Sequence, residues 1–131
     1  MKKHVADLDH SKALFDAGIE VGSYFQWCWY EKSPITGNPT TPLVTDEKFN
    51  LKGVSHIHAP LPCELMEILK PYNIGYRWNL VEEFECMLTL PNAINCYETY
   101  ALKPANALCD MILWLKAEGL LEQPYRTEAE G

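Results

Sequence analysis

The chain has 131 residues and a formal net charge of −7, from 11 Lys and Arg residues against 18 Asp and Glu residues. Its length fits one domain with one core, and its hydrophobic fraction of 47% is that of a globular protein rather than a disordered one. The acidic balance argues against nucleic-acid binding, because nucleic acids are bound through clustered cations and the basic residues here cluster only at Lys2 and Lys3.

The cysteines and the N-terminal residues bear on the cellular compartment. The chain has five cysteines, an odd number, and no two of them have the CxxC spacing. This pattern is typical of reduced thiols in the cytoplasm. The chain turns acidic soon after Lys3, so it lacks the apolar region of a signal peptide, and no apolar run approaches the length of a membrane span. The sequence therefore predicts a cytoplasmic protein without a membrane segment.

The first predicted element is a short helix over residues 9–18, which Asp9 or Ser11 can cap and which Gly18 ends. Residues 21–30 (VGSYFQWCWY) follow as a central strand, because aromatic side chains alternate along them. One face of this strand carries Phe25, Trp27 and Trp29, and the other carries Tyr24, Gln26, Cys28 and Tyr30.

The next part of the chain is less regular. Residues 31–42 hold three prolines and the turn signal Gly37-Asn38, which predicts an exposed connection between strands. Residues 43–45 are expected to resume the pairing, and residues 46–55 are interpreted as a polar loop with an extended exit.

The middle of the chain predicts one helix and three strands. Residues 60–70 (PLPCELMEILK) have an apolar stripe at helical spacing and a proline suited to the first turn. Apolar residues alternate along residues 76–80, 84–90 and 94–102, which predicts strands. A helix through residues 81–88 is the competing interpretation.

The most regular pattern in the chain predicts a long amphipathic helix over residues 103–121. Pro104 suits its first turn, and Gly119 can adopt the left-handed conformation that ends a helix. Its apolar stripe consists of Leu108, Met111, Ile112 and Leu115. Such a stripe requires a partner surface, so we expect Leu108 and Trp114 to be buried against a sheet.

These elements predict an α+β fold in the order α-β-β-α-β-β-β-α. Residues 1–121 are expected to form a single domain, an antiparallel sheet of about four to five strands with helices packed mainly on one face. Residues 122–131 are polar and are expected to form a flexible C-terminal tail.

Two segments of the chain carry a recognisable pattern, residues 58–69 (HAPLPCELMEIL) and residues 107–121 (ALCDMILWLKAEGLL). They resemble the Pro-Ala-Pro-x-x-x-Glu-Leu-like segment and the C-terminal Ala-Leu-x-x-Met-x-x-Trp-Leu helix of a group of short uncharacterised proteins, encoded by phages and integrated mobile elements of gut bacteria. The matching residues are Ala59, Pro60, Glu64 and Leu65 in the first segment and Ala107, Leu108, Met111, Trp114 and Leu115 in the second.

The resemblance covers roughly residues 10–121. The chain departs from the group at Leu61, where a Thr helix cap is usual, and at Asn106, where Asp is frequent. These departures affect helix capping rather than catalysis. The resemblance implies an accessory phage-type protein without an assigned activity, and it supplies no catalytic residues.

The sharpest candidate for chemistry is the group His56, His58 and Cys63, because imidazole and thiolate are zinc ligands and alternate strand positions share a face. A fourth ligand would be a carboxylate or Cys86. The competing interpretation is a polar strand end followed by a helix in which Cys63 is buried in the first turn. A third possibility is a reactive thiol, because a helix N-terminus lowers the pKa of a cysteine placed there. Because no second ligand pair has tight spacing, we expect no metal and no cofactor.

The strand over residues 21–30 suggests a contact surface. Because helices can cover only one face of a single sheet, the face with Tyr24, Gln26 and Tyr30 would meet solvent or another chain. The alternative is that the loop 31–42 folds over this face.

The preferred hypothesis is a non-catalytic interaction protein of a phage-type element that forms a homodimer or binds a host or phage protein. The alternative is a small ligand- or metal-binding domain, or an enzyme, that uses the region of His56, His58 and Cys63.

Overall fold

The computed structural model describes residues 4–46, 48, 52–89 and 96–121. Within these residues the chain forms three helices and two three-stranded antiparallel sheets, which confirms the predicted α+β class. In chain order the elements are α1 (Leu8–Asp16), β1 (Phe25–Trp29), β2 (Leu43–Asp46), β3 (Ser55–His58), α2 (Pro62–Leu69), β4 (Ile74–Trp78), β5 (Phe84–Thr89), β6 (Cys96–Ala101) and α3 (Pro104–Ala117). None of the described helices has the length and apolar character needed to cross a membrane.

The strands are divided between two sheets, where the sequence predicts one. Sheet A has the order β2-β1-β3 and sheet B the order β4-β5-β6, and all neighbouring strands are antiparallel. The observed order, α-β-β-β-α-β-β-β-α, contains one strand more than predicted. The additional strand is β3, which is short and carries Ile57 between two histidines, so its apolar alternation is too weak to recognise. Along the chain, helix α2 follows β3 and stands between the strands of sheet A and those of sheet B.

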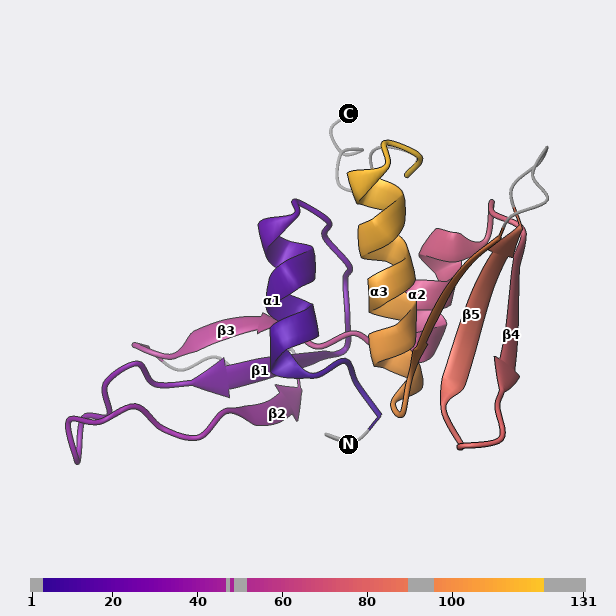
Figure 1. Cartoon of the computed structure of the whole chain (residues 1–131). Helices are drawn as coiled ribbons and strands as arrows, with labels where there is room; N and C mark the ends of the chain where they lie inside the picture. Colours follow the sequence, from indigo (N-terminus) through magenta and orange to yellow (C-terminus); the bar gives the residue numbers. More distant parts are fainter. Residues whose placement is uncertain (1–3, 47, 49–51, 90–95, 122–131) are drawn as a thin grey trace.

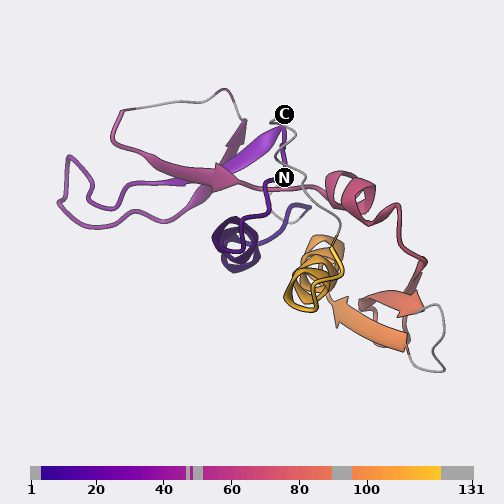
Figure 2. The same ribbon diagram turned by 90° about the horizontal axis from the view of Figure 1, so that it is seen from above.

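The helices lie between the sheets. Helices α1 and α3 are side by side, with sheet A next to α1 and sheet B next to α3 (Figure 1). The view from above shows the same succession of sheet A, α1, α3 and sheet B, with α2 beside α3 (Figure 2). Each sheet therefore has a helix on one of its faces.

Helix α3 is the centre of the main core, as its apolar pattern predicts. Its fully buried apolar side chains include Leu108, Met111, Ile112 and Leu115. They share one core cluster with side chains from α1, α2 and β5. Trp114 is only half-buried, because it lies at the margin of this cluster and stacks on Tyr97 of β6 with ring centroids 4.0 Å apart.

The C-terminal end of α3 follows the predicted motif. Gly119 has a φ of 73°, and the N–H of Leu120 donates to the carbonyl of Leu115 at 2.9 Å. The residue that returns to the core is Leu121, which is buried, whereas Leu120 is exposed. The tail predicted over residues 122–131 lies outside the described residues.

The segment between β4 and β5 is a tight turn, so the helix considered over residues 81–88 does not form. Asn79 organises this turn, because its side-chain oxygen accepts from the N–H groups of Val81 (3.0 Å) and Glu83 (2.9 Å). Glu82 adopts a positive φ of 63° within it. The chain then enters β5 directly.

A smaller second cluster holds the N-terminal segment on sheet A. Val5, Trp27 and Ala59 are buried together, and the indole N–H of Trp27 donates to the carbonyl of Ala6 at 2.9 Å. The aromatic face of β1 that contains Trp27 is therefore the face covered by the N-terminal part of the chain.

Candidate functional site

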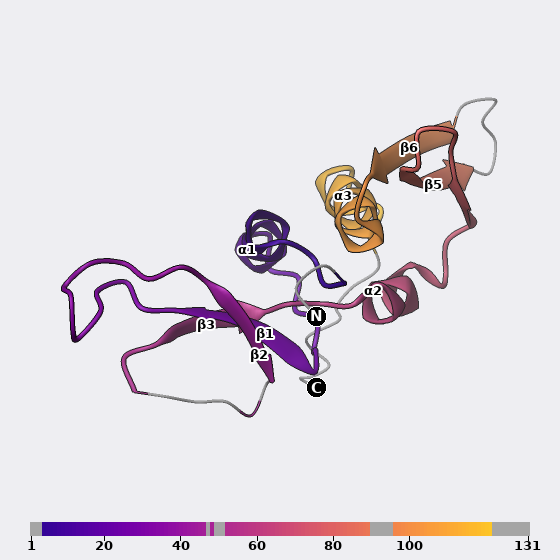
Figure 3. The same ribbon diagram turned by 90° about the horizontal axis from the view of Figure 1, so that it is seen from below.

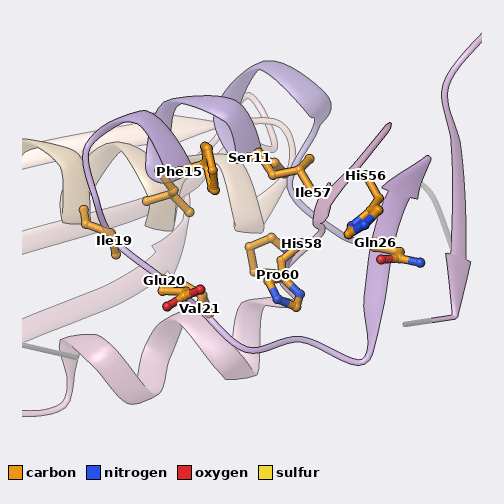
Figure 4. Close-up of a pocket in the computed structure, with 11 residues that line it drawn as sticks. Ser11, Phe15, Ile19, Glu20, Val21, Gln26, His56, Ile57, His58 and Pro60 are labelled. Atoms are coloured by element: carbon orange, nitrogen blue, oxygen red, sulfur yellow. The ribbon is translucent and has the colours of Figure 1, made fainter. Parts of the chain in front are cut away.

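A pocket of about 340 Å³ lies between α1 and β3. Figure 4 shows His56 and Gln26 at one end of this pocket and Ile19 at the other. The lining residues come from α1, the segment after it, β1, β3 and the segment that follows β3, namely Ser11, Leu14, Phe15, Ile19, Glu20, Val21, Gln26, His56, Ile57, His58 and Pro60. Most of the lining is thus apolar, with polar groups concentrated on the strands.

The two histidines of the sequence motif reach the same pocket. In the β1–β3 ladder, His58 is opposite Gln26 and His56 is opposite Cys28, so the two imidazoles occupy alternate positions, as the spacing predicts. Gln26 is buried and donates from Nε2 to the carbonyl of Asp46 at 3.3 Å. This arrangement suits a small ligand with an apolar body and a polar end that hydrogen-bonds to imidazole.

Cys63 does not join the two histidines. It is exposed in the first turn of α2, rather than buried as the competing interpretation expects, and it does not line the pocket. Across the described residues, no group of three or more His, Cys, Asp and Glu side chains could hold a metal ion. Both His56 and His58 thus line the pocket, and within the described residues no third side chain is placed beside them as a zinc site would use.

The residues of the contact surface suggested by the sequence differ in exposure. Tyr24 is exposed and precedes β1, and its backbone N–H donates to Glu64 Oε2 at 3.3 Å. Gln26 is buried in the sheet, and Tyr30 is half-buried after the strand ends. Thr40, from the loop 31–42, holds the backbone of Tyr30 by accepting from its N–H (2.8 Å) and donating to its carbonyl (3.0 Å).

A group of exposed apolar side chains lies instead on β4 and the turn that follows. Its members, which we call the β4 surface, are Tyr76, Trp78, Leu80 and Val81, with exposed fractions of 38%, 58%, 103% and 67%. The ring of Phe84 joins the first two, since it stacks on Tyr76 (5.9 Å) and meets Trp78 edge-on (5.4 Å). The alternation of residues 76–80 predicts the strand, but it does not show whether a helix covers these side chains.

The position of β4 in sheet B explains its exposure. Helix α3 packs on sheet B mainly through β5 and β6. Strand β4 forms the far edge of the sheet, away from α3 (Figure 1). Its aromatic side chains therefore extend beyond the helical cover.

A charged cluster connects the start of α1 to α3. His10 donates from Nδ1 to Asp7 Oδ1 (2.7 Å) and from Nε2 to Asp110 Oδ1 (3.0 Å). The hydrogen bond to Asp110 is the largest cause that raises the pKa of His10 to about 9; burial opposes it, and the bond to Asp7 adds to it. Asp7 also caps α1 through the N–H of His10, in place of the predicted caps Asp9 and Ser11.

Asn106 completes this connection. Its side-chain oxygen accepts from the N–H of Asp7 (3.0 Å), and its Nδ2 donates to Asp7 Oδ2 (3.1 Å). An ionised Asp at this position could accept but could not donate, so the amide of Asn106 supplies a hydrogen bond that a carboxylate would lack. Sequence reasoning missed this cluster, because its members are about a hundred residues apart along the chain.

A scan against protein-family models, a search of curated proteins and a search of solved structures found no match to this chain. The geometry of the described residues is therefore the basis on which a function is inferred.

Proposed function

We propose that the chain is a non-catalytic interaction protein, accessory to a phage-type or mobile element, that binds another protein through the β4 surface. The observation that carries this proposal is the exposure of Tyr76, Trp78, Leu80 and Val81 along one edge of sheet B. Single exposed apolar residues are ordinary, whereas a contiguous group of them marks a contact site.

The residue types support this proposal. Tryptophan and tyrosine are enriched at protein interfaces and at their energetic centres, because each contributes a large area at a small cost in conformational entropy. The Phe84 ring holds Tyr76 and Trp78 in place before any partner binds. A surface that is already ordered loses less entropy on binding.

The chemistry of the buried cysteines favours a non-catalytic role. Burial raises the pKa of Cys86 to about 11 and raises the pKa of Cys109 further. Both thiols are therefore protonated at neutral pH, and a protonated thiol is a poor nucleophile. Neither residue lies on the β4 surface.

A comparison of matched variants tests the proposal. Leu80 and Val81 are exposed, so Leu80→Ser/Val81→Ser should leave the fold unchanged and weaken partner binding about tenfold or more. The control is Leu43→Ser, which removes a similarly exposed leucine from sheet A. A partner captured from the host is identified, purified and titrated against each variant by calorimetry. Equal affinities for the parent and the double variant would show that the β4 surface does not bind the partner.

A second candidate function is favoured by the pocket between α1 and β3, where two histidines face an apolar cavity. In this alternative, which the sequence suggests for the His56/His58/Cys63 region, the chain binds a small amphipathic ligand or a metal through His56 and His58, because Cys63 does not line the pocket. An anionic naphthalene sulfonate dye serves as the probe, with Trp78→Ser as control for binding at the β4 surface. If the pocket binds a small ligand, the dye should bind saturably and His58→Ala should remove this binding. If it binds a metal, elemental analysis should find about one zinc per chain, and His56→Ala should remove it.

A further inference from the structure

Among the described residues, the outer edge of β4 has no neighbouring strand, and of its outward N–H groups that of Ile74 already donates to the carbonyl of Tyr72 (3.0 Å). The ladder between β4 and β5 is bounded by the bonds from Thr89 N–H to the Asn73 carbonyl (3.1 Å) and from Asn79 N–H to the Glu83 carbonyl (2.9 Å). Hydrogen-bonded pairs alternate along an antiparallel ladder, so the backbone groups of Tyr76 and Trp78 point away from β5. In the described part of the chain no strand pairs with this edge.

We propose that β4 pairs with β4 of a second copy of the chain, antiparallel, across a two-fold axis at Tyr76. The two sheets B then form one continuous six-stranded sheet. This inference rests on the proposed interaction function and names its partner. The two Tyr76 residues face each other and each donates its N–H to the carbonyl of the other, because their backbone groups are the ones that point outward.

The side chains of this pairing are self-complementary. With Tyr76 on the axis, Trp78 of one copy is opposite Ile74 of the second copy, on the same face as the two Tyr76 rings. On the other face, Arg77 is opposite Gly75 of the second copy, and each Arg77 keeps its ion pair with Glu85 at 2.7 Å. No two like charges are directly opposite along the strand pair.

The antiparallel direction also keeps apart the two β4–β5 turns, each of which carries Glu82 and Glu83. It places this turn of one copy beside the segment between α2 and β4 of the second copy, with Leu80 near Tyr72 and Glu82 near Lys70. Lys70 is exposed, at the end of α2. A groove of about 270 Å³ borders this segment and is lined by Met66, Glu67, Leu69, Lys70, Tyr72, Ile74 and Tyr76. The exposed apolar turn of each copy thus meets a partly apolar groove and a lysine.

The mass in solution gives the first test. Light scattering at roughly 100 μM chain, far above a Kd of about 1 μM, should report about twice the 15.0 kDa of one chain. Leu80→Lys places a second lysine beside Lys70, so it should weaken the dimer about tenfold or more, while the matched Leu43→Lys should not. Leu80 is fully exposed, so the variant keeps the fold, which circular dichroism checks.

A covalent cross-link tests the register. Residues in a hydrogen-bonded pair have Cα atoms about 5.5 Å apart, a separation that a disulfide spans. In a Cys63→Ser background, which removes an exposed thiol, Tyr76→Cys should give a disulfide-linked dimer under mild oxidation. Leu43→Cys in the same background should give no more dimer than Cys63→Ser alone.

Three outcomes would overturn the pairing: a mass of 15.0 kDa for the parent chain, equal dimer affinities for Leu80→Lys and Leu43→Lys, or equal cross-linking of Tyr76→Cys and Leu43→Cys. A monomer whose binding to a purified host protein is lost in Leu80→Ser/Val81→Ser would remove the second copy as partner. It would leave the proposed interaction function intact.

Discussion

At the scale of single residues, His10 has the most distinctive environment in the described structure. Its imidazole bridges two carboxylates, Asp7 at the start of α1 and Asp110 on α3. The charge of Lys103, just before α3, also helps to lower the pKa of Asp7. This cluster ties the start of α1 to α3, and α1 also carries side chains that line the pocket with His56 and His58.

The His10 bridge predicts a specific dependence of stability on pH. The pKa of His10 is raised from 6.5 to about 9 in the folded chain, so its contribution is fully present below pH 6.5 and is lost as pH rises through about 9. Because both carboxylates are partly exposed, we expect the His10 bridge to contribute about 1–2 kcal/mol to the free energy of unfolding. Urea unfolding at pH 6.5 and 9.5 measures it in the parent and in His10→Gln. A parallel loss of stability in both proteins would contradict the assignment to His10.

At the scale of elements, α3 is where sequence reasoning was most successful. Leu108, Met111, Ile112 and Leu115 recur at helical spacing and are all fully buried, because a three- to four-residue period on a long segment leaves few alternatives. The position of Trp114 was less predictable, since the margin of the stripe depends on how far β6 reaches under the helix.

Substitutions on α3 should separate its centre from its margin. Leu108→Ala removes a fully buried side chain and should cost about 2–5 kcal/mol, whereas Trp114→Ala removes a half-buried ring stacked on Tyr97 and should cost about 1–2 kcal/mol. Urea unfolding of both variants gives the comparison. If Trp114→Ala proves the more destabilising of the two, the margin of α3 matters more than its centre.

Strand β3 shows why the sheets were less predictable than the helix. Its one apolar residue between histidines carries little local signal, yet it pairs with β1, which lies about thirty residues earlier in the chain. Pairing between distant segments is decided by burial and hydrogen bonds that no local pattern reveals. The same limit hid the β4 surface, because the alternation of Tyr76 and Trp78 shows a strand but not whether a helix covers it.

At the scale of the whole molecule, the two sheets lie on opposite sides of the helices and have different outer boundaries. Sheet A, which Figure 3 shows on one side of α1, has β2 and β3 at its edges. The pocket lies along β3, whereas the exposed aromatic residues lie on β4, an edge strand of sheet B. A ligand in the pocket and a second copy on β4 would therefore bind at separate places.

The net charge of the whole molecule predicts how the proposed dimer responds to salt. Each copy carries a formal charge of −7, so two copies repel at long range. The contact itself consists mainly of backbone hydrogen bonds and apolar side chains, which salt does not weaken, and the exposed charges Glu82 and Lys70 at its ends contribute little. Raising the salt from about 0.01 M to about 0.15 M shortens the screening length from about 30 Å to about 8 Å. The dimer Kd should therefore fall severalfold, measured by sedimentation equilibrium, with Leu43→Lys as a control that makes each chain less negative away from β4. A Kd that rises with salt would show that ion pairs, rather than the apolar edge of β4, hold the two copies together.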